Sequence, residues 1–246
     1  MTTVQSFLIF LSAHIAGDFY FQSRGLAELK NKTRRGLLYH SLLYGLAFLA
    51  TLLVAKPGLP ALAVIIIGHG LIDWLKYSFL HRDDPKKKED KRLLREEAPW
   101  LFLLDQGLHL LLIYLAVSLW PGSGPQAWFP ARGFDALRWM LLLALMGKPA
   151  NVSFKRVFTR FANYRSKTTT VEGAGSLIGF FERALTVIFV HMGQYSALGF
   201  VMAAKSLARF KLLTEDQGFA EYYLIGTLYS ILFALLAYLV VFKLLV

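Results

Sequence analysis

The sequence contains no cysteine. Disulfides, thiolate metal sites and cysteine nucleophiles are therefore excluded together, which leaves histidine and carboxylate side chains as the main protein ligands for a metal ion. Acidic residues are also few, at 16 against 27 lysines and arginines, which gives a formal net charge of +11. Such a charge could indicate nucleic-acid binding. However, no recognition motif accompanies the basic stretches, and we expect no nucleic-acid partner.

Apolar residues are abundant. Hydrophobic residues make up 56% of the chain, including 20 phenylalanines, which is too high for an ordinary soluble domain of this size and indicates an integral membrane protein. The first apolar run has neither a basic region before it nor a small-residue cleavage site, so we expect a mature helix there rather than a signal peptide.

Eight apolar segments predict an all-α, polytopic transmembrane helix bundle. A helix needs roughly 17 to 25 apolar residues to cross a bilayer. The segments are 3–22, 37–55, 59–80, 98–120, 135–150, 175–192, 194–211 and 221–245. The fifth and seventh are short and could be partly re-entrant.

Basic residues follow every second apolar segment. They gather in 24–35, 82–95, 148–167 and 205–211, whereas the alternate loops carry only Lys56 and Arg132. The positive-inside rule therefore predicts that the basic loops are cytoplasmic and that both termini lie outside. In this interpretation most of the basic residues are solvated flanks that contact membrane lipids.

The stretch 121–134 is rich in proline and glycine and is the best candidate for a boundary. It would separate an N-terminal four-helix unit, residues 1–120, from a C-terminal transmembrane half, residues 135–246.

Three apolar segments each carry a histidine and an aspartate four residues apart, and a fourth carries a histidine. The motifs are SAHIAGDFYFQ with His14 and Asp18, HGLID with His69 and Asp73, DQGLH with Asp105 and His109, and LLYHSLLY with His40. Residues four apart share one face of a helix, so each pair presents imidazole and carboxylate to the same neighbour.

All seven side chains fall toward the predicted cytoplasmic side, within a layer on the order of 12 Å at a helical rise of about 1.5 Å per residue. An ionisable residue inside a membrane costs about 2.5–3.5 kcal/mol on insertion scales. A divalent cation would offset that cost, and imidazole with carboxylate favours zinc, with manganese or iron as alternatives.

Seven candidates would suit two ions that share a carboxylate, or one ion with outer histidine–carboxylate partners. His40 is either a ligand or a general base, and Asp105 is a second candidate for a catalytic role. Any single histidine could instead be a polar link between helices. His81 and His191 lack the pattern and are not expected to bind metal.

Basic residues near these segments are candidates for binding an anionic substrate group. Lys76, one turn beyond Asp73, could bind a phosphate or extend toward the lipid headgroups. In the C-terminal half the candidates are Arg183, Lys205 and Arg209. They would form either an anion pocket or ion pairs with Glu182 or Glu221 that join three helices.

The ordered motifs AHIAGDFYFQ, LLYHSLLY, GHGLIDWLK and DQGLH resemble those of the bacterial integral-membrane family catalogued as domain of unknown function 3307. The later segments IGFFERALTVIF, ALGFVMAAKSLARF and EYYLIGTLYS resemble the C-terminal extension of many members. The resemblance implies a multi-pass protein of the bacterial inner membrane. It does not indicate which activity the protein has.

The pattern favours a membrane-embedded metal-dependent hydrolase acting at the cytoplasmic face on a lipid-linked or amphipathic phosphate or ester. A proton- or divalent-cation-coupled transporter or channel component is the first alternative, because the same residues could carry protons or a divalent cation. A non-catalytic assembly subunit with a structural metal is the second. A conduction path needs polar groups on both sides of the midplane, and the outer half of these segments is nearly bare.

Overall fold

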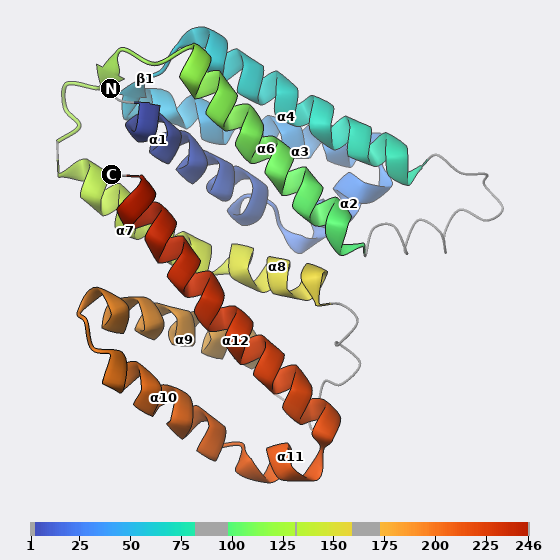
Figure 1. The fold of residues 1–246 in the computed structure, drawn as a ribbon. Coiled ribbons are helices and arrows are strands. Elements are labelled where there is room, and N and C mark those ends of the chain that lie inside the picture. The colour runs from blue at the N-terminus through green and yellow to red at the C-terminus, as the bar shows by residue number, and fades with distance from the viewer. Residues whose placement is uncertain (1–2, 82–97, 131, 159–172, 246) are drawn as a thin grey trace. The chain divides into compact units, whose positions relative to one another are not determined.

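A computed structural model describes residues 3–81, 98–130, 132–158 and 173–245 (Figure 1). The basic stretch 82–95 and much of 148–167 lie outside these ranges. Within them the fold is all-α, as predicted, apart from two short strands, β1 (Ala55–Lys56) and β2 (Gly124–Pro125). The strands pair antiparallel, with Ala55 opposite Pro125 and Lys56 opposite Gly124.

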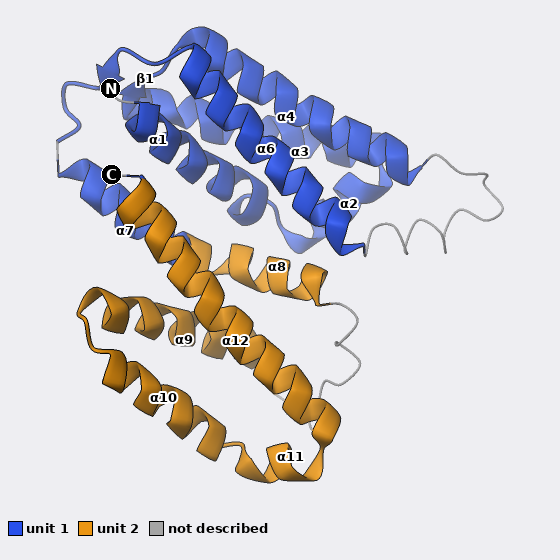
Figure 2. Ribbon diagram, viewed as in Figure 1, with its two compact units in different colours: residues 1–144, 245–246 blue, residues 145–244 orange. Residues whose placement is uncertain are grey.

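The chain forms two compact units, which divide between Ala144 and Leu145 (Figure 2). The helical elements of the first unit are α1 (Thr3–Ile15), η1 (Ala16–Tyr20), α2 (Arg24–Lys32), α3 (Arg34–Leu49), η2 (Ala50–Leu53), α4 (Leu59–Leu80), α6 (Pro99–Leu119) and most of α7 (Gly133–Met146). Those of the second are α8 (Lys148–Val157), α9 (Ala174–His191), α10 (Tyr195–Leu207), α11 (Phe210–Glu215), α12 (Gln217–Leu239) and η5 (Val240–Leu244). The boundary expected in the proline- and glycine-rich stretch 121–134 remains a prediction.

Helices form in all eight predicted apolar segments, but not all are long enough to cross a membrane. Five described helical segments have the length and apolar character of a span: 34–53, 59–80, 99–119, 174–191 and 217–244. A sixth is added if Thr3–Tyr20 and Arg24–Lys32, which meet at 86°, count as one broken span. α7 and α10 have only 14 and 13 residues, so the fifth and seventh segments are the short ones, as predicted.

Four helices of the first unit close into a bundle. α1 contacts α3 and α6, α3 contacts α4, and α4 contacts α6, so each helix has two neighbours around a shared interior. Toward the N-terminal end of α1 that interior is apolar: the rings of Phe10 and Phe48 lie 5.5 Å apart, and Leu8, Ile65 and Ile113 are fully buried.

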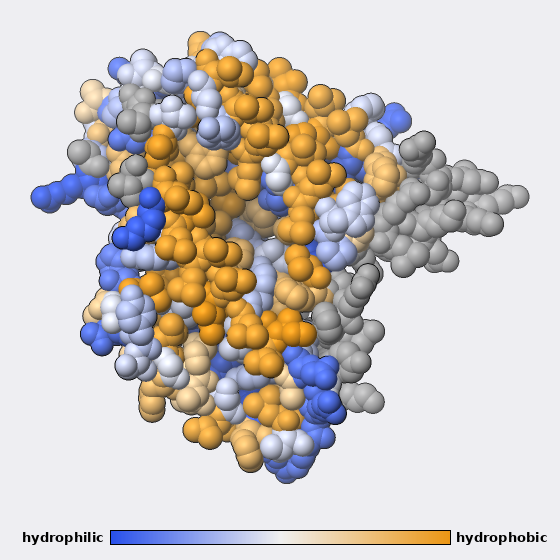
Figure 3. Space-filling view, in the orientation of Figure 1, coloured by the Kyte–Doolittle hydropathy of each residue, from blue (hydrophilic) through white to orange (hydrophobic). Residues whose placement is uncertain are grey.

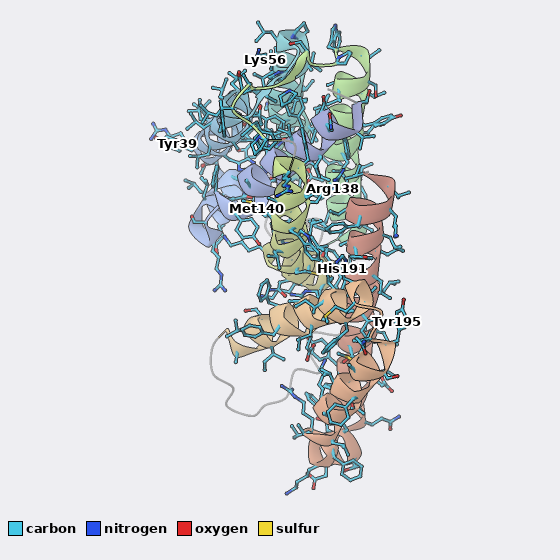
Figure 4. All side chains as sticks on the ribbon, turned by 90° about the vertical axis from the view of Figure 1, so that its left-hand side faces the viewer. Tyr39, Lys56, Arg138, Met140, His191 and Tyr195 are labelled. Carbon is cyan, nitrogen blue, oxygen red and sulfur yellow. The ribbon has the colours of Figure 1, made fainter. Side chains whose placement is uncertain are left out.

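The outward faces of the bundle are apolar as well. On α3 the side chain of His40 is fully buried, whereas Tyr39, the preceding residue, is 57% exposed and lies at the outer side of the first unit (Figure 4). Hydrophobic side chains cover much of the visible surface of both units (Figure 3). An apolar exterior is expected of helices that meet lipid, with ionisable residues turned toward the bundle interior.

Two amphipathic helices, α2 and α8, lie within the stretches 24–35 and 148–167, which were expected to be basic loops. α2 is capped at its start by Ser23, whose hydroxyl accepts from the Leu26 amide at 3.2 Å. Thr33 ends α2 and caps α3, accepting from the Gly36 amide at 3.0 Å. Two capping residues ten positions apart therefore turn the chain and fold α2 back against α3.

Candidate metal centre

The polar cluster begins at a change of helix type in the first segment. α1 passes into a π-helical turn, η1, where the amide of Phe21 donates to the carbonyl of Ala16 at 2.8 Å. Such single π turns occur frequently at functional sites. Asp18 lies inside this turn and is 8% exposed. Gly17 permits the close approach of α3, because a Cβ there would lie 2.9 Å from the Tyr44 ring.

Four ligand-type atoms from three different segments converge beside this turn. The Nε2 atom of His40 lies 3.1 Å from the Nε2 atom of His69, 3.3 Å from Asp18 Oδ1 and 3.4 Å from Asp73 Oδ2. The Nε2 atom of His69 lies 3.1 Å from the same Asp73 oxygen. The His40, His69 and Asp73 side chains are inaccessible to solvent.

These separations fit a bound cation. Four nitrogen or oxygen ligands at about 2.0–2.1 Å from a tetrahedral ion stand roughly 3.3 Å apart. Asp18, His40 and His69 thus form a group that could hold a metal ion. The Nε2 atoms of His40 and His69 face each other at 3.1 Å, a distance at which two lone pairs would repel. Either one nitrogen carries a proton and donates it to the other, or a cation lies between them.

A second group joins the first through shared residues. His69, Asp73 and His109 also offer ligand atoms within 4.8 Å of one another. Among the described residues, His69 Nδ1, Asp73 Oδ1 and His109 Nε2 are buried and have no hydrogen-bond partner. Buried polar atoms are rarely left unpaired, so each is open to a further ligand. Asp73 thus offers one oxygen to the first group and another that is unpaired.

Neighbouring side chains fix the orientation of the histidines. Nδ1 of His109 donates to the backbone carbonyl of Asp105 at 2.7 Å, which leaves the Nε2 lone pair for a ligand. Tyr44 stacks flat on the His69 ring at 3.4 Å, and its hydroxyl lies 3.2 Å from His14 Nδ1. Outer contacts of this kind hold metal-ligating imidazoles in place.

His14 and Asp105, both predicted as ligands, lie at the edge of the cluster and outside the two three-residue groups found among the described residues. His14 Nε2 lies 3.4 Å from Gln106 Oε1, and Gln106 Nε2 donates to Asp18 Oδ2 at 2.8 Å. The glutamine thereby links the two members of the first His–Asp pair.

Asp105 is paired with one of the predicted anion-binding residues. Nζ of Lys76 donates to Asp105 Oδ2 at 2.9 Å, while Oδ1 of Asp105 is buried and has no partner among the described residues. The Lys76 side chain is 21% exposed and that of Asp105 6% exposed. Lys76 is therefore the more accessible member of this pair.

Lys30 is a member of the cluster that the sequence did not predict, since the basic residues of 24–35 were expected to be solvated flanks. Its ammonium lies 2.8 Å from Asp73 Oδ2 and 3.6 Å from Asp18 Oδ1, and its side chain is only 9% exposed. The residue lies near the end of α2, and its flexible four-carbon stem reaches into the cluster. The available signal was the amphipathic pattern of α2, in which Lys30 follows Leu26 by four residues and so lies on the same face of the helix.

The predicted anion-binding residues of the second unit have protein partners. Lys205 donates to Glu182 at 2.9 Å and to Thr227 at 2.9 Å. Arg183 donates to the Met146 carbonyl at 2.8 Å, to Asn151 at 2.9 Å and to Ser230 at 3.2 Å.

Aromatic rings complete the surroundings of these cations. Lys205 and Arg209 stand 4.8 and 6.0 Å from the Tyr223 ring centroid.

His191 lies at the connection between α9 and α10 (Figure 4), and its Nδ1 lies 3.2 Å from the Tyr238 hydroxyl.

A double-mutant cycle tests whether the Lys205–Glu182 pair stabilises the second unit. We expect Lys205→Met and Glu182→Gln to show a coupling energy of roughly 0.5–3 kcal/mol, because the pair is close and largely buried. Lys211 and Glu215, 4.0 Å apart and well exposed, are the matched control and should show no measurable coupling. Unfolding in detergent measures both cycles, and equal coupling in the two would contradict a structural role.

A family model described as protein of unknown function (DUF3307) matches residues 6–132, slightly more than half of the chain. The chain belongs to the DUF3307 family. All seven predicted ligands, together with Lys30, Tyr44 and Lys76, fall within the matched residues. The DUF3307 match leaves the rest of the chain unassigned, so the likeness of the later segments to a C-terminal extension stays a prediction. No curated protein and no solved structure matches the chain.

Proposed function

We propose that this protein is a metal-dependent hydrolase embedded in the bacterial inner membrane, acting at the cytoplasmic face on a lipid-linked or amphipathic phosphate or ester. The observation that carries the proposal is the convergence of His40, His69, Asp18 and Asp73, whose ligand atoms lie 3.1–3.4 Å apart in the four pairs given above. Two imidazoles and two carboxylates suit zinc, with manganese or iron as alternatives.

The carboxylates and imidazoles would hold the ion, and residues beside them would serve the reaction. A bound divalent ion supplies a Lewis acid and a water of lowered pKa. Asp105 is the candidate general base, because its unpaired Oδ1 can accept a proton and its Oδ2 is held by Lys76. Gln106 Nε2 lies 2.8 Å from Asp18 and 3.4 Å from Asp105. It would therefore hold the metal ligand Asp18 and the base Asp105 in fixed positions relative to each other.

The distribution of buried charge favours a local site over a conduction path. In the described part of the first unit, the buried polar side chains outside the cluster are Ser6 and Thr51, both hydroxyls. A path for ions would need polar groups on both sides of the membrane midplane, and the ionisable ones gather in a single cluster. A structural ion is the second candidate, because His40 and His69 are completely buried and a closed set of ligands is typical of structural zinc.

Turnover by the zinc-loaded protein separates the two candidates. We expect hydrolysis of a chromogenic phosphodiester or ester in detergent, and a roughly 10²–10⁴-fold lower kcat for Asp105→Asn with metal content unchanged. Glu28→Gln, on the exposed face of α2, is the control and should retain full activity. A protein that is stabilised by zinc but hydrolyses neither substrate would be a structural metalloprotein.

A further inference from the structure

Lys30 places an ammonium among the carboxylates that would bind the metal ion. Its Nζ lies 2.8 Å from Asp73 Oδ2, the same oxygen that stands 3.1 Å from His69 Nε2 and 3.4 Å from His40 Nε2. The ammonium and a cation would therefore share one carboxylate. Once that carboxylate binds a divalent ion, its attraction for Lys30 falls, because its charge is already compensated.

The position of Lys30 is fixed by the packing of its helix. A Cβ on Gly36 of α3 would lie 2.3 Å from the carbonyl carbon and oxygen of Leu29, so the backbones of α2 and α3 are in direct contact beside Lys30. An ammonium has three N–H donors. Among the described residues its charged partners are two carboxylates, one of them 3.6 Å away, which leaves donor capacity for a ligand.

The formal charges of the cluster favour an anionic ligand. Asp18, Asp73 and Asp105 carry three negative charges, and Lys30 and Lys76 carry two positive ones, so the cluster has one net negative charge when its histidines are neutral. A single divalent ion would change this to one positive charge. An uncompensated charge is costly in a buried site, and a ligand with one negative charge would remove it.

We infer that Lys30 binds the anionic phosphate group of the substrate beside the metal, and that the substrate is a phosphodiester rather than a carboxylic ester. This inference rests on the proposed function. A phosphodiester brings one negative charge and two oxygens that can accept from an ammonium, whereas a carboxylic ester is neutral and would leave the positive charge in place. Lys30 is then a specificity-determining residue.

The test compares zinc and inorganic phosphate binding by the full-length protein, its Lys30→Met variant and a control, Lys32→Met. Lys32 lies on the same helix, but its side chain is 57% exposed and pairs with Glu28 at 4.0 Å. We expect Lys30→Met to retain zinc and to bind phosphate roughly tenfold more weakly or worse, while Lys32→Met matches the wild type in both. Lys30→Arg should restore phosphate binding.

The outcomes separate this inference from the proposed function. If the wild type binds no zinc, the proposed function fails. If it binds zinc, and Lys30→Met binds phosphate as tightly as the wild type, the role of Lys30 is wrong and the metal centre stands. Loss of zinc from folded Lys30→Met, or failure of both Lys30→Met and Lys30→Gln to fold in excess zinc, would show that the zinc-loaded centre needs Lys30 as a counter-ion and would overturn its assignment.

A short-chain phosphatidylglycerol serves as a second probe, because the phosphate could belong to a lipid or to a free ester. Tighter binding of the lipid than of inorganic phosphate would identify a lipid headgroup as the ligand. Equal or weaker binding would identify a water-soluble phosphate ester. The contrast between Lys30→Met and Lys32→Met should hold for whichever probe binds.

Discussion

His69→Ala should remove the metal from the purified protein. His69 belongs to both three-residue groups that could hold an ion, and its Nε2 stands 3.1 Å from both His40 Nε2 and Asp73 Oδ2. Losing an outer partner of a metal ligand costs roughly 10–100-fold in affinity, so losing a shared ligand should cost at least 100-fold. Elemental analysis after dialysis against a weak chelator measures the loss.

Two controls make that result interpretable. His81→Ala changes a histidine of the same unit whose ring contacts Tyr77, with Nδ1 2.8 Å from the Tyr77 carbonyl, and it should keep its metal. Tyr44→Phe keeps the ring that stacks on His69 while removing the hydroxyl near His14, so it should retain most of the metal. A folded His69→Ala protein with unchanged metal content would reject the ligand assignment.

Helical spacing predicted part of the set of side chains that meet. The pairs His69–Asp73 and Asp105–His109 lie on regular α-helices, α4 and α6, where residues four apart share a face. Four helices that bury such faces against one another bring the residues together almost regardless of the details of packing. The depth of the motifs along each segment then predicted a single cluster.

The division of roles within the cluster could not be predicted in the same way. Asp18 lies in a π-helical turn, where the α-helical relation between residues four apart no longer holds, and it contacts His40 and Gln106 rather than His14. No residue type in AHIAGDFYFQ specifies a π turn. The turn is seen only in the folded chain, where Gly17 lies so near α3 that a Cβ would come within 2.9 Å of the Tyr44 ring.

Lys30 shows why charge counting alone is a poor guide to the interior. Five basic residues between 24 and 35 fit the positive-inside rule equally well, and only the path of the chain decides which of them enters the bundle. The caps at Ser23 and Thr33 fold α2 back along α3. Lys30 therefore faces two carboxylates, while Lys32, two residues later, remains exposed.

Lys30→Met should strongly destabilise the metal-free protein and have little effect on the zinc-loaded one. Without the ammonium, Asp18 and Asp73 are left in a site where their side chains are 7% and 0% exposed. Removing one partner of a buried ion pair costs about 3–5 kcal/mol. A divalent ion replaces the lost positive charge, and zinc at 100 times its Kd adds about 2.7 kcal/mol through binding to the folded state alone.

Unfolding in detergent, with a chelator or with excess zinc, measures both states. The variant should show a larger zinc-induced stabilisation than the wild type, because zinc and Lys30 compensate the same two carboxylates. Lys32→Met should behave as the wild type in both conditions, since its exposed pair contributes little. If Lys30→Met is as stable as the wild type without metal, the ammonium does not hold the empty centre together. The buried carboxylates must then be neutralised by protons, which would also remove the charge balance that selects an anionic substrate.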